Sequence, residues 1–359
     1  MEHGKCQRNK LFENRIDVDN SLNTNDYKML KQNLTQYVRE NKSDLFIELL
    51  DKNKCSFNRL IIEKNFNGDT FVHLAALYGC VGVLKYYYDF KKDIFECRNR
   101  DGKTALHIAA QSSQLECVQY LLSCNVCVNA LKRSDWTPLM LACTQSNVKI
   151  VREILLYGAD LNMINKDGWT AFHIASREGN IDSIRCLLEF NPLAWRTKSK
   201  NGRTPLHSAC LCGHIEVVKF LVENANYEIN MKDSCGRTPL MDAVSGEYNE
   251  IVEFLIETGA LIEDEDKLGK NLLHLAAEAG NLDCITLLVK KKYFNINSQT
   301  SEGLSPLHLA CKQYKKDSVY LLVELGADCN LKDKQGRIAL DYIIDEQHQA
   351  DFVSLLEKR

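Results

Sequence analysis

Residues 201–209 read NGRTPLHSA, and this stretch decides the fold because its pattern returns along the chain. From residue 70 onward, the threonine position recurs at intervals of 34, 33, 33, 34, 34, 33, 34 and 33 residues. It holds Thr70, Thr104, Thr137, Thr170, Thr204, Thr238, Asn271, Ser305 and Ile338. A fixed period of this length indicates a stack of similar structural units.

Two further positions return with the threonine. Two residues before it stand Gly68, Gly102, Asp135, Gly168, Gly202, Gly236, Gly269, Gly303 and Gly336, and five after it stand Ala75, Ala109, Ala142, Ala175, Ala209, Ala243, Ala276, Ala310 and Ile343. Glycine suits a tight turn, threonine caps a helix, and alanine lets helices approach closely. A 33-residue period with Thr-Pro-Leu-His-x-Ala resembles the ankyrin repeat. The sequence therefore predicts an all-α ankyrin-repeat solenoid of about nine to ten helix-turn-helix repeats with β-turn tips.

The proline and histidine counts follow from this repeat. Pro138, Pro205, Pro239 and Pro306 come directly after the cap, where a missing N–H costs nothing. Six of the nine histidines share the position three after the cap: His73, His107, His173, His207, His274 and His308. We therefore interpret them as structural hydrogen-bonding residues at the head of each first helix, rather than as metal ligands or general bases. Gly158, Gly259 and Gly326 are expected to end second helices.

The repeats also set the domain organisation. Residues 1–25 are polar and asparagine-rich, and we expect them to be mobile. Residues 26–66 are predicted to form a degenerate capping repeat, and residues 67–359 nine ankyrin units, of which the last is a cap. A length of 359 residues suggests about two domains, but the unbroken period favours one continuous solenoid.

The composition limits the classes of partner that the chain is expected to bind. The chain has 45 Lys and Arg against 48 Asp and Glu, a net charge of −3, which argues against a nucleic-acid binder. The polar N-terminus has no signal-peptide pattern, and no apolar run reaches the roughly 18 residues that span a bilayer. We therefore expect a cytoplasmic protein, also present in the nucleus, that binds no membrane.

The 15 cysteines are expected to be reduced and mostly small helix residues. The close pairs Cys124/Cys127 and Cys210/Cys212 have no second pair at zinc-finger spacing, so no metal and no cofactor is expected. No nucleophile elbow, phosphate loop, dinucleotide fingerprint or zincin motif occurs. Asp135, Cys143 and His173 already have places in the repeat, so the chain is predicted not to be an enzyme.

Function is then sought in the variable positions. Four residues before the cap stand Arg100, Arg133, Lys166 and Lys200, and nearby tips add Arg98, Lys132, Arg196, Lys198, Arg203 and Lys232. This basic stripe is followed by an acidic region that includes residues 263–266. Charged turn tips can also be simple solvated surface, and the sequence leaves that alternative open.

All three tryptophans fall beside the basic stripe. Trp136 and Trp169 stand directly before the cap, where a turn residue usually faces water, and Trp195 lies near the next tip. Exposed tryptophan beside arginine and lysine is the composition of a binding hot spot. Packing of these rings on each other or on arginine is the alternative.

The variable residues resemble the ankyrin repeat domain-containing protein 16 family. The likeness is carried by LKRSDWTPLM at 131–140, KDGW at 166–169, FHIASREG at 172–179, AW at 194–195, TPLH at 204–207, CG at 235–236 and LMDA at 240–243. It is strong over about residues 98–245. The resemblance implies a non-enzymatic partner of alanyl-tRNA synthetase that accepts misactivated serine on its lysine side chains and so protects translation fidelity.

The serine acceptors carry over only in part. The family's acceptor places hold Arg133, Lys166 and Arg196 here, and arginine cannot act as an amine nucleophile. The candidate acceptors are therefore Lys166, which stands at one of the family's acceptor positions, and Lys132 and Lys198, which stand close to the two positions that hold arginine here. We expect partner binding through Trp136, Trp169, Trp195, Arg100, Arg133, Arg196 and Lys200. An ankyrin scaffold for another acidic protein is the alternative; a ubiquitin-ligase adaptor ranks below it, since no added box follows the last repeat.

Overall fold

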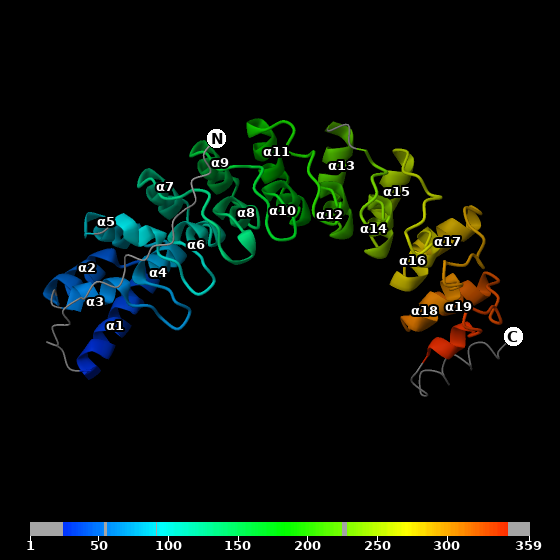
Figure 1. The fold of residues 1–359 in the computed structure, drawn as a ribbon, viewed down its shortest axis with the longest axis horizontal. Helices are drawn as coiled ribbons and strands as arrows, with labels where there is room; N and C mark the ends of the chain where they lie inside the picture. Colours follow the sequence, from blue (N-terminus) through cyan, green and yellow to red (C-terminus); the bar gives the residue numbers. More distant parts are fainter. Residues whose placement is uncertain (1–23, 54–55, 91, 225–227, 344–359) are drawn as a thin grey trace. The chain divides into compact units, whose positions relative to one another are not determined.

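The structure is a computed structural model that describes residues 24–53, 56–90, 92–224 and 228–343. Every regular element in these ranges is helical, and they contain no strand (Figure 1). The all-α fold predicted from the repeat is confirmed. Most of the N-terminal segment expected to be mobile, residues 1–23, lies outside the described residues, while Thr24 and Asn25 already belong to the first helix.

The chain divides into two compact units, which we describe separately. Unit 1 comprises residues 1–133 and 156–159, and unit 2 comprises residues 134–155 and 160–359. A short 3-10 turn, η3 (Arg133–Asp135), lies where the chain passes from one to the other. The sequence period continues through this point, because Thr104, Thr137 and Thr170 keep their spacing of 33 residues.

Unit 1 is built from two layers of helices. Its elements are α1 (Thr24–Arg39), α2 (Ser43–Lys52), α3 (Phe57–Ile62), α4 (Phe71–Tyr78), α5 (Val81–Phe90), η2 (Lys92–Glu96), α6 (Ala105–Gln111) and α7 (Leu115–Ser123). In one layer α4 packs against α1 and α6, and in the other α5 packs against α2 and α7. The α1–α2 pair thus covers the first repeat that carries the full signature, and it buries Leu34, Val38, Phe46 and Leu50 completely.

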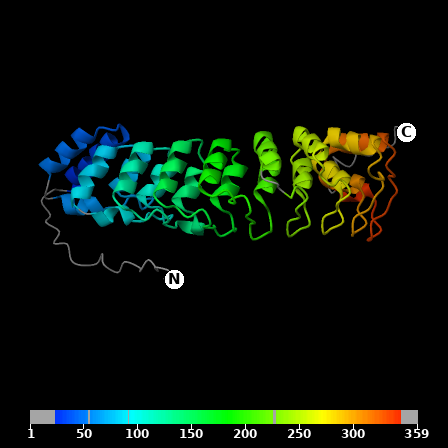
Figure 2. The ribbon, with the colours of Figure 1, turned by 90° about the horizontal axis from the view of Figure 1, so that it is seen from above.

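Unit 2 repeats the same layered arrangement. Its inner helices are α8 (Pro138–Ala142), α10 (Ala171–Arg177), α12 (Pro205–Leu211), α14 (Pro239–Ser245), α16 (Leu272–Ala279) and α18 (Pro306–Lys312), followed by the 3-10 turn η4 (Ala339–Tyr342). Its outer helices are α9 (Val148–Leu156), α11 (Ile181–Phe190), α13 (Ile215–Asn224), α15 (Asn249–Glu257), α17 (Leu282–Lys290) and α19 (Lys316–Glu324). Each inner helix packs on the next. The turn tips of unit 2 project from one edge of these layers (Figure 2).

The helix ends use the residues that the repeat supplies. Thr204 has an extended backbone, with φ −95° and ψ 165°, and its hydroxyl accepts the N–H of His207 at 3.5 Å. Pro205 follows as the first helical residue. Past the second helices, Gly158, Gly259 and Gly326 have φ of 84°, 97° and 96°, as expected for residues that end a helix.

Five of the repeated histidines each link their own repeat to the next one. Nδ1 of His207 accepts the backbone N–H of Thr204 at 3.1 Å, so its proton lies on Nε2, which donates to the carbonyl of Arg237 at 3.0 Å. The same bond to the following repeat joins His73 to Lys103, His173 to Arg203, His274 to Leu304 and His308 to Arg337, at 3.0, 3.1, 3.1 and 3.2 Å. The structural role predicted for these histidines is confirmed, and we call the set the histidine ladder.

Burial keeps the histidine ladder neutral. It lowers the pKa of His173, His207 and His274 to about 4, and their hydrogen bonds to backbone carbonyls offset this only in part. Three repeats depart from the pattern, because Met140, Met241 and, in the last repeat, Asp341 stand three residues after their caps. Both methionines are buried, so an apolar side chain also fills this position.

Candidate functional site

The turn tips of unit 2 form a rigid framework. The N–H of Gly168 donates to the carbonyl of Asn165 at 2.9 Å, which closes a β-turn, and the side-chain oxygen of Asn165 accepts the N–H groups of Asp167 and Trp169 at 2.9 Å each. The next tip is joined to this one because the N–H of Lys200 donates to the carbonyl of Asp167 at 3.0 Å. The β-turn tips predicted from the repeat are therefore present, and backbone bonds hold neighbouring tips together.

Gly168 is required where two tips meet. Its φ is 80°, in the left-handed region, and a Cβ there would lie 2.5 Å from the backbone nitrogen of Lys200. Any side chain would therefore push the neighbouring tip away. The repeated glycine thus places the lysine side chains of adjacent tips.

Trp169 lies on the side of the first helix of its own repeat. Its ring stacks on that of His173, with centroids 6.2 Å apart and planes 24° apart, and the guanidinium of Arg177 lies 5.6 Å from the ring centroid. The ring is half-buried as a result. The expectation that Trp169 faces water is only partly met, because its own helix covers one side.

The other two tryptophans are also half-buried. The guanidinium of Arg196 lies 4.8 Å from the centroid of the Trp195 ring. The segment next to it reaches the Trp169 repeat, since the hydroxyl of Thr197 lies 3.3 Å from Nδ1 of His173. Tryptophan–arginine packing therefore occurs, but within a repeat or between sequence neighbours.

Exposed cations stand close to Trp169 and Trp195 in the sequence. Lys166, Arg196, Lys198 and Lys200 are exposed, and within the described ranges none of the four forms a salt bridge. We name the resulting patch the tryptophan surface and define it as Lys166, Trp169, Arg177, Trp195, Arg196, Lys198 and Lys200. It lies entirely in unit 2 and combines aromatic faces with positive charge.

Beyond Lys200, cations of the basic stripe form ion pairs with carboxylates of the chain itself. The buried carboxylate of Asp242 accepts Nη2 of Arg203 at 2.5 Å and Nε of Arg237 at 3.2 Å. Lys232 pairs with Asp264 at 2.7 Å. The cations predicted here to face a partner are therefore engaged in ion pairs within the chain.

Burial also affects the carboxyl that holds this cluster. It raises the pKa of Asp242 to about 6, while Arg203 and Arg237 act in the opposite direction. The partners Arg203 and Asp242 stand 39 residues apart, so no local pattern indicated the pair.

The candidate residues of unit 1 form a separate group. Lys132 is half-buried, and burial together with Lys103 lowers its pKa. Arg133 is exposed, and the guanidinium of Arg100 lies 4.7 Å from the centroid of the Phe66 ring. Phe66 is 83% exposed, and sequence reasoning missed it because it precedes the first complete repeat signature.

The residues considered for catalysis are not arranged for it. His173 is buried in the histidine ladder, and burial raises the pKa of the Cys143 thiol, so it is no ready nucleophile. In the part of the chain that the structure describes, no three His, Cys, Asp or Glu side chains come together in a way that would hold a metal ion. No described helix is both long and apolar enough to cross a membrane.

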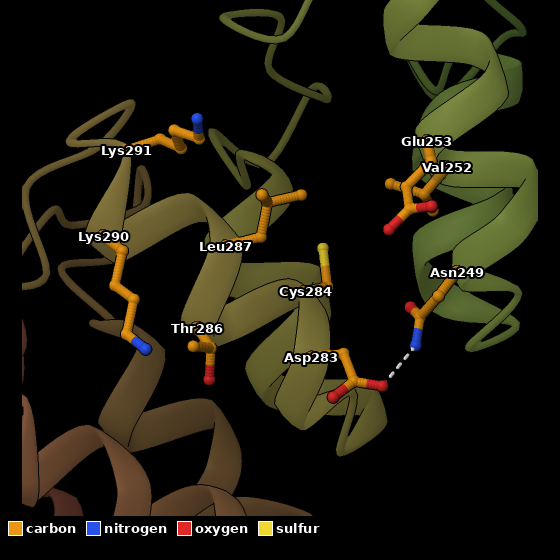
Figure 3. A pocket seen from close by; sticks show the side chains of 9 residues that line it. All are labelled: Asn249, Val252, Glu253, Asp283, Cys284, Thr286, Leu287, Lys290 and Lys291. Atoms are coloured by element: carbon orange, nitrogen blue, oxygen red, sulfur yellow. Dashed lines mark hydrogen bonds between the residues drawn. The ribbon is translucent and has the colours of Figure 1, made fainter.

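A hollow of about 410 Å³ lies between outer helices α15 and α17 of unit 2 (Figure 3). At its edge the side-chain amide of Asn249 donates to the carboxylate of Asp283 at 3.0 Å. Val252 and Cys284 on its floor are almost fully buried. It lies on the outer helices rather than at the turn tips.

Stacked helix pairs, linked tips and a cationic aromatic surface define a repeat scaffold of the kind that binds other proteins. The family described as "Ankyrin repeats (3 copies)" matches residues 34–132, 83–165, 139–233, 225–300 and 273–359. The chain belongs to the ankyrin repeat family. Proteins of this family are typically non-catalytic scaffolds for protein interactions.

Some of the similar proteins carry names of regulatory subunits. The chain is 36% identical over 89 residues to protein phosphatase 1 regulatory subunit 27 of Mus musculus, a match of 25% of this chain and 54% of that protein. It is 36% identical over 97 residues to the probable 26S proteasome regulatory subunit p28 of Saccharomyces cerevisiae, covering 27% of this chain and 42% of that protein. The chain thus spans about half the length of these relatives.

Proposed function

We propose that this chain is a non-enzymatic scaffold that binds an acidic protein surface through the tryptophan surface of unit 2, and that the partner is alanyl-tRNA synthetase. The observation that carries the proposal is Trp169, which is stacked on His173 and covered by Arg177, beside exposed lysines without a salt bridge in the described ranges. A ring fixed in this way loses little freedom on binding. Cations that have no salt bridge attract acidic groups of a partner, and this attraction becomes stronger when binding removes water from the interface.

The identity of the partner rests on the family resemblance over residues 98–245, which includes KDGW at 166–169 and AW at 194–195. Both motifs contribute to the tryptophan surface. The names of the similar proteins support a role as a regulatory partner in a complex. In this role we propose that the chain acts in the cytoplasm and in the nucleus.

We further propose that lysines of this chain accept misactivated serine. The neutral Nζ attacks the carbonyl carbon of the activated serine, an amide bond forms, the bond to the leaving phosphate breaks, and the amine proton passes to solvent. Lys166 occupies the family's acceptor place, and Lys198 lies on the same surface. Lys132 gains support from its environment, because a lowered pKa leaves more of its amine neutral.

Binding is tested with purified alanyl-tRNA synthetase captured on immobilised chain. The Trp169→Ala/Trp195→Ala double variant is expected to lose about tenfold or more in affinity, as for removal of hot-spot rings. Tyr320→Ala is the matched control, because this aromatic is 56% exposed on outer helix α19. Equal capture by the double variant and the control would contradict the proposed surface. If the synthetase is not captured at all, an unrelated acidic partner becomes the better reading.

Serine transfer is tested by incubating the complex with serine and ATP and mapping modified lysines by mass spectrometry. Serine is expected on Lys132, Lys166 or Lys198 and is expected to disappear from each site in the corresponding Lys→Arg variant. Alanine in place of serine, and omission of ATP, are the controls. Unmodified lysines in an intact complex would show that the chain tethers or regulates the synthetase without accepting serine.

A further inference from the structure

Unit 1 carries a hollow of about 690 Å³ at its own turn tips. Its floor comes from inner helices α4 and α6, with Leu74, Leu77 and Ile108, and Leu77 is 38% exposed. Phe66, the 83% exposed ring, stands on its rim. We name this feature the Phe66 hollow. It offers apolar surface to a ligand and shares no residue with the tryptophan surface.

Backbone hydrogen bonds fix the rim of the Phe66 hollow. The N–H of Arg100 donates to the carbonyl of Asn67 at 3.0 Å, and the N–H of Arg133 donates to the carbonyl of Asp101 at 2.9 Å. The side-chain oxygen of Asn99 accepts the N–H groups of Asp101 and Lys103 at 3.0 and 2.9 Å. The rim is thus organised before any ligand arrives, which reduces the entropy lost on binding.

The net charge of the rim is positive, because three cations, Arg100, Lys103 and Arg133, outnumber the carboxylates of Asp69 and Asp101. Arg100, Lys103 and Arg133 line the hollow, and none of them has a salt bridge to a carboxylate in the described part of the chain. The carboxylate of Asp69 is occupied by amide groups, since Asn65 and Asn99 donate to its two oxygens at 3.2 and 2.8 Å. The arginine over Phe66 adds a cation to the exposed ring.

We propose that the Phe66 hollow binds a linear acidic peptide segment of a partner protein, with apolar side chains on the Leu77 floor and carboxylates at Arg100 and Arg133. An extended peptide places alternate side chains on opposite faces, so alternating acidic and apolar residues meet both surfaces together. Planar guanidinium groups suit carboxylates because they donate paired hydrogen bonds. This site goes beyond the proposed function, whose partner-binding tryptophan surface lies in unit 2.

The experiment measures binding of a short fluorescein-labelled peptide, in which glutamates alternate with leucines, to the full chain by fluorescence anisotropy. Arg100→Ala/Arg133→Ala and Phe66→Ala are each expected to weaken binding about tenfold. Glutamine in place of glutamate, or serine in place of leucine, is expected to weaken it similarly, and added salt lowers the affinity for the glutamate peptide. Lys291→Ala/Lys292→Ala, which removes two exposed cations of unit 2, is the matched control.

The proposal is overturned if the peptide does not bind, if the glutamine peptide binds equally well, or if the control weakens binding as much as the arginine variant. Circular dichroism checks that each variant is folded, and a photo-crosslinking version of the peptide on the unaltered chain gives a second measurement. Crosslinks are expected near Phe66 and Leu77, and crosslinks confined to unit 2 would also overturn it. Capture of alanyl-tRNA synthetase by Phe66→Ala separates this failure from failure of the proposed function.

Discussion

Acidification is expected to unfold unit 2 through the histidine ladder. His173, His207 and His274 all lie in unit 2, and burial lowers the pKa of each from 6.5 to about 4. Between pH 4 and pH 6.5 the unfolded chain binds more protons than the folded chain. Stability therefore rises with pH across this window and is lost as pH falls through it.

The size of the effect follows from these pKa values. At pH 5 the lowered pKa removes about 2 kcal/mol of stability for each histidine, or roughly 6 kcal/mol for the three. Asp242 acts in the opposite direction, because burial raises its pKa from 3.8 to about 6, and folded protein then takes up a proton as pH falls. This offsets about 1 kcal/mol at pH 5, and a small part of the histidine loss is already present at pH 7, so the net loss from pH 7 to pH 5 is roughly 4–5 kcal/mol.

The assay is urea unfolding followed by tryptophan fluorescence. All three tryptophans, Trp136, Trp169 and Trp195, belong to unit 2, so the signal reports the unit that contains these histidines. His207→Met supplies the matched variant, because Met140 and Met241 already fill the same position in other repeats. This variant loses the hydrogen bonds of both ring nitrogens and about 1–2 kcal/mol of stability at pH 7. The further loss between pH 7 and pH 5 is expected to shrink by about 2 kcal/mol relative to the unaltered chain.

Two results would refute this reasoning. One is a free energy of unfolding that stays constant between pH 7 and pH 5. The other is an equal pH dependence in the unaltered chain and in His207→Met, which would place the titrating groups elsewhere.

Three further changes test the packing of unit 2 in the same unfolding assay. Gly168→Ala is expected to cost about 2–4 kcal/mol, because φ is 80° and the new Cβ meets the Lys200 nitrogen at 2.5 Å; Gly326→Ala, with nothing within 4 Å, should cost clearly less. Thr204→Ala removes a helix cap and should cost about 1 kcal/mol, and no loss would contradict the capping role. Asp242→Ala removes the buried carboxylate that Arg203 and Arg237 share, leaving Arg203 with Asp233 and Arg237 with Met241 and Ser245, and should cost about 2–3 kcal/mol at pH 7; an unchanged midpoint would show that the cluster adds no stability.

The repeat signature predicted the scaffold because each of its residues acts locally. Thr204 caps a helix that begins at the next residue, and His207 bonds to that cap. Such contacts join residues at most three positions apart, so the sequence of a single repeat is enough to predict them. The bond from His207 to Arg237 spans 30 residues, and the sequence indicated it only indirectly, through the period itself.

The candidate site was predicted less completely, for the same reason. Trp169 and Lys166 were found because they depart from the repeat at fixed positions. The ion pair of Arg203 with Asp242 joins different repeats and removes a cation that composition alone assigned to the partner surface. Phe66 stands before the first full signature, and only its 83% exposure and the arginine over its ring reveal it.

The backbone bonds between tips have a consequence for how such a chain changes in length. Lys267 donates its N–H to the carbonyl of Cys235, and Lys334 donates to that of Glu302. Excision of residues 268–301 would join Lys267 directly to Glu302, and both bonds would keep their own donor and acceptor. These bonds between tips use backbone groups and not particular side chains. Tandem duplication or loss of a whole repeat therefore keeps the hydrogen bonds that join neighbouring tips.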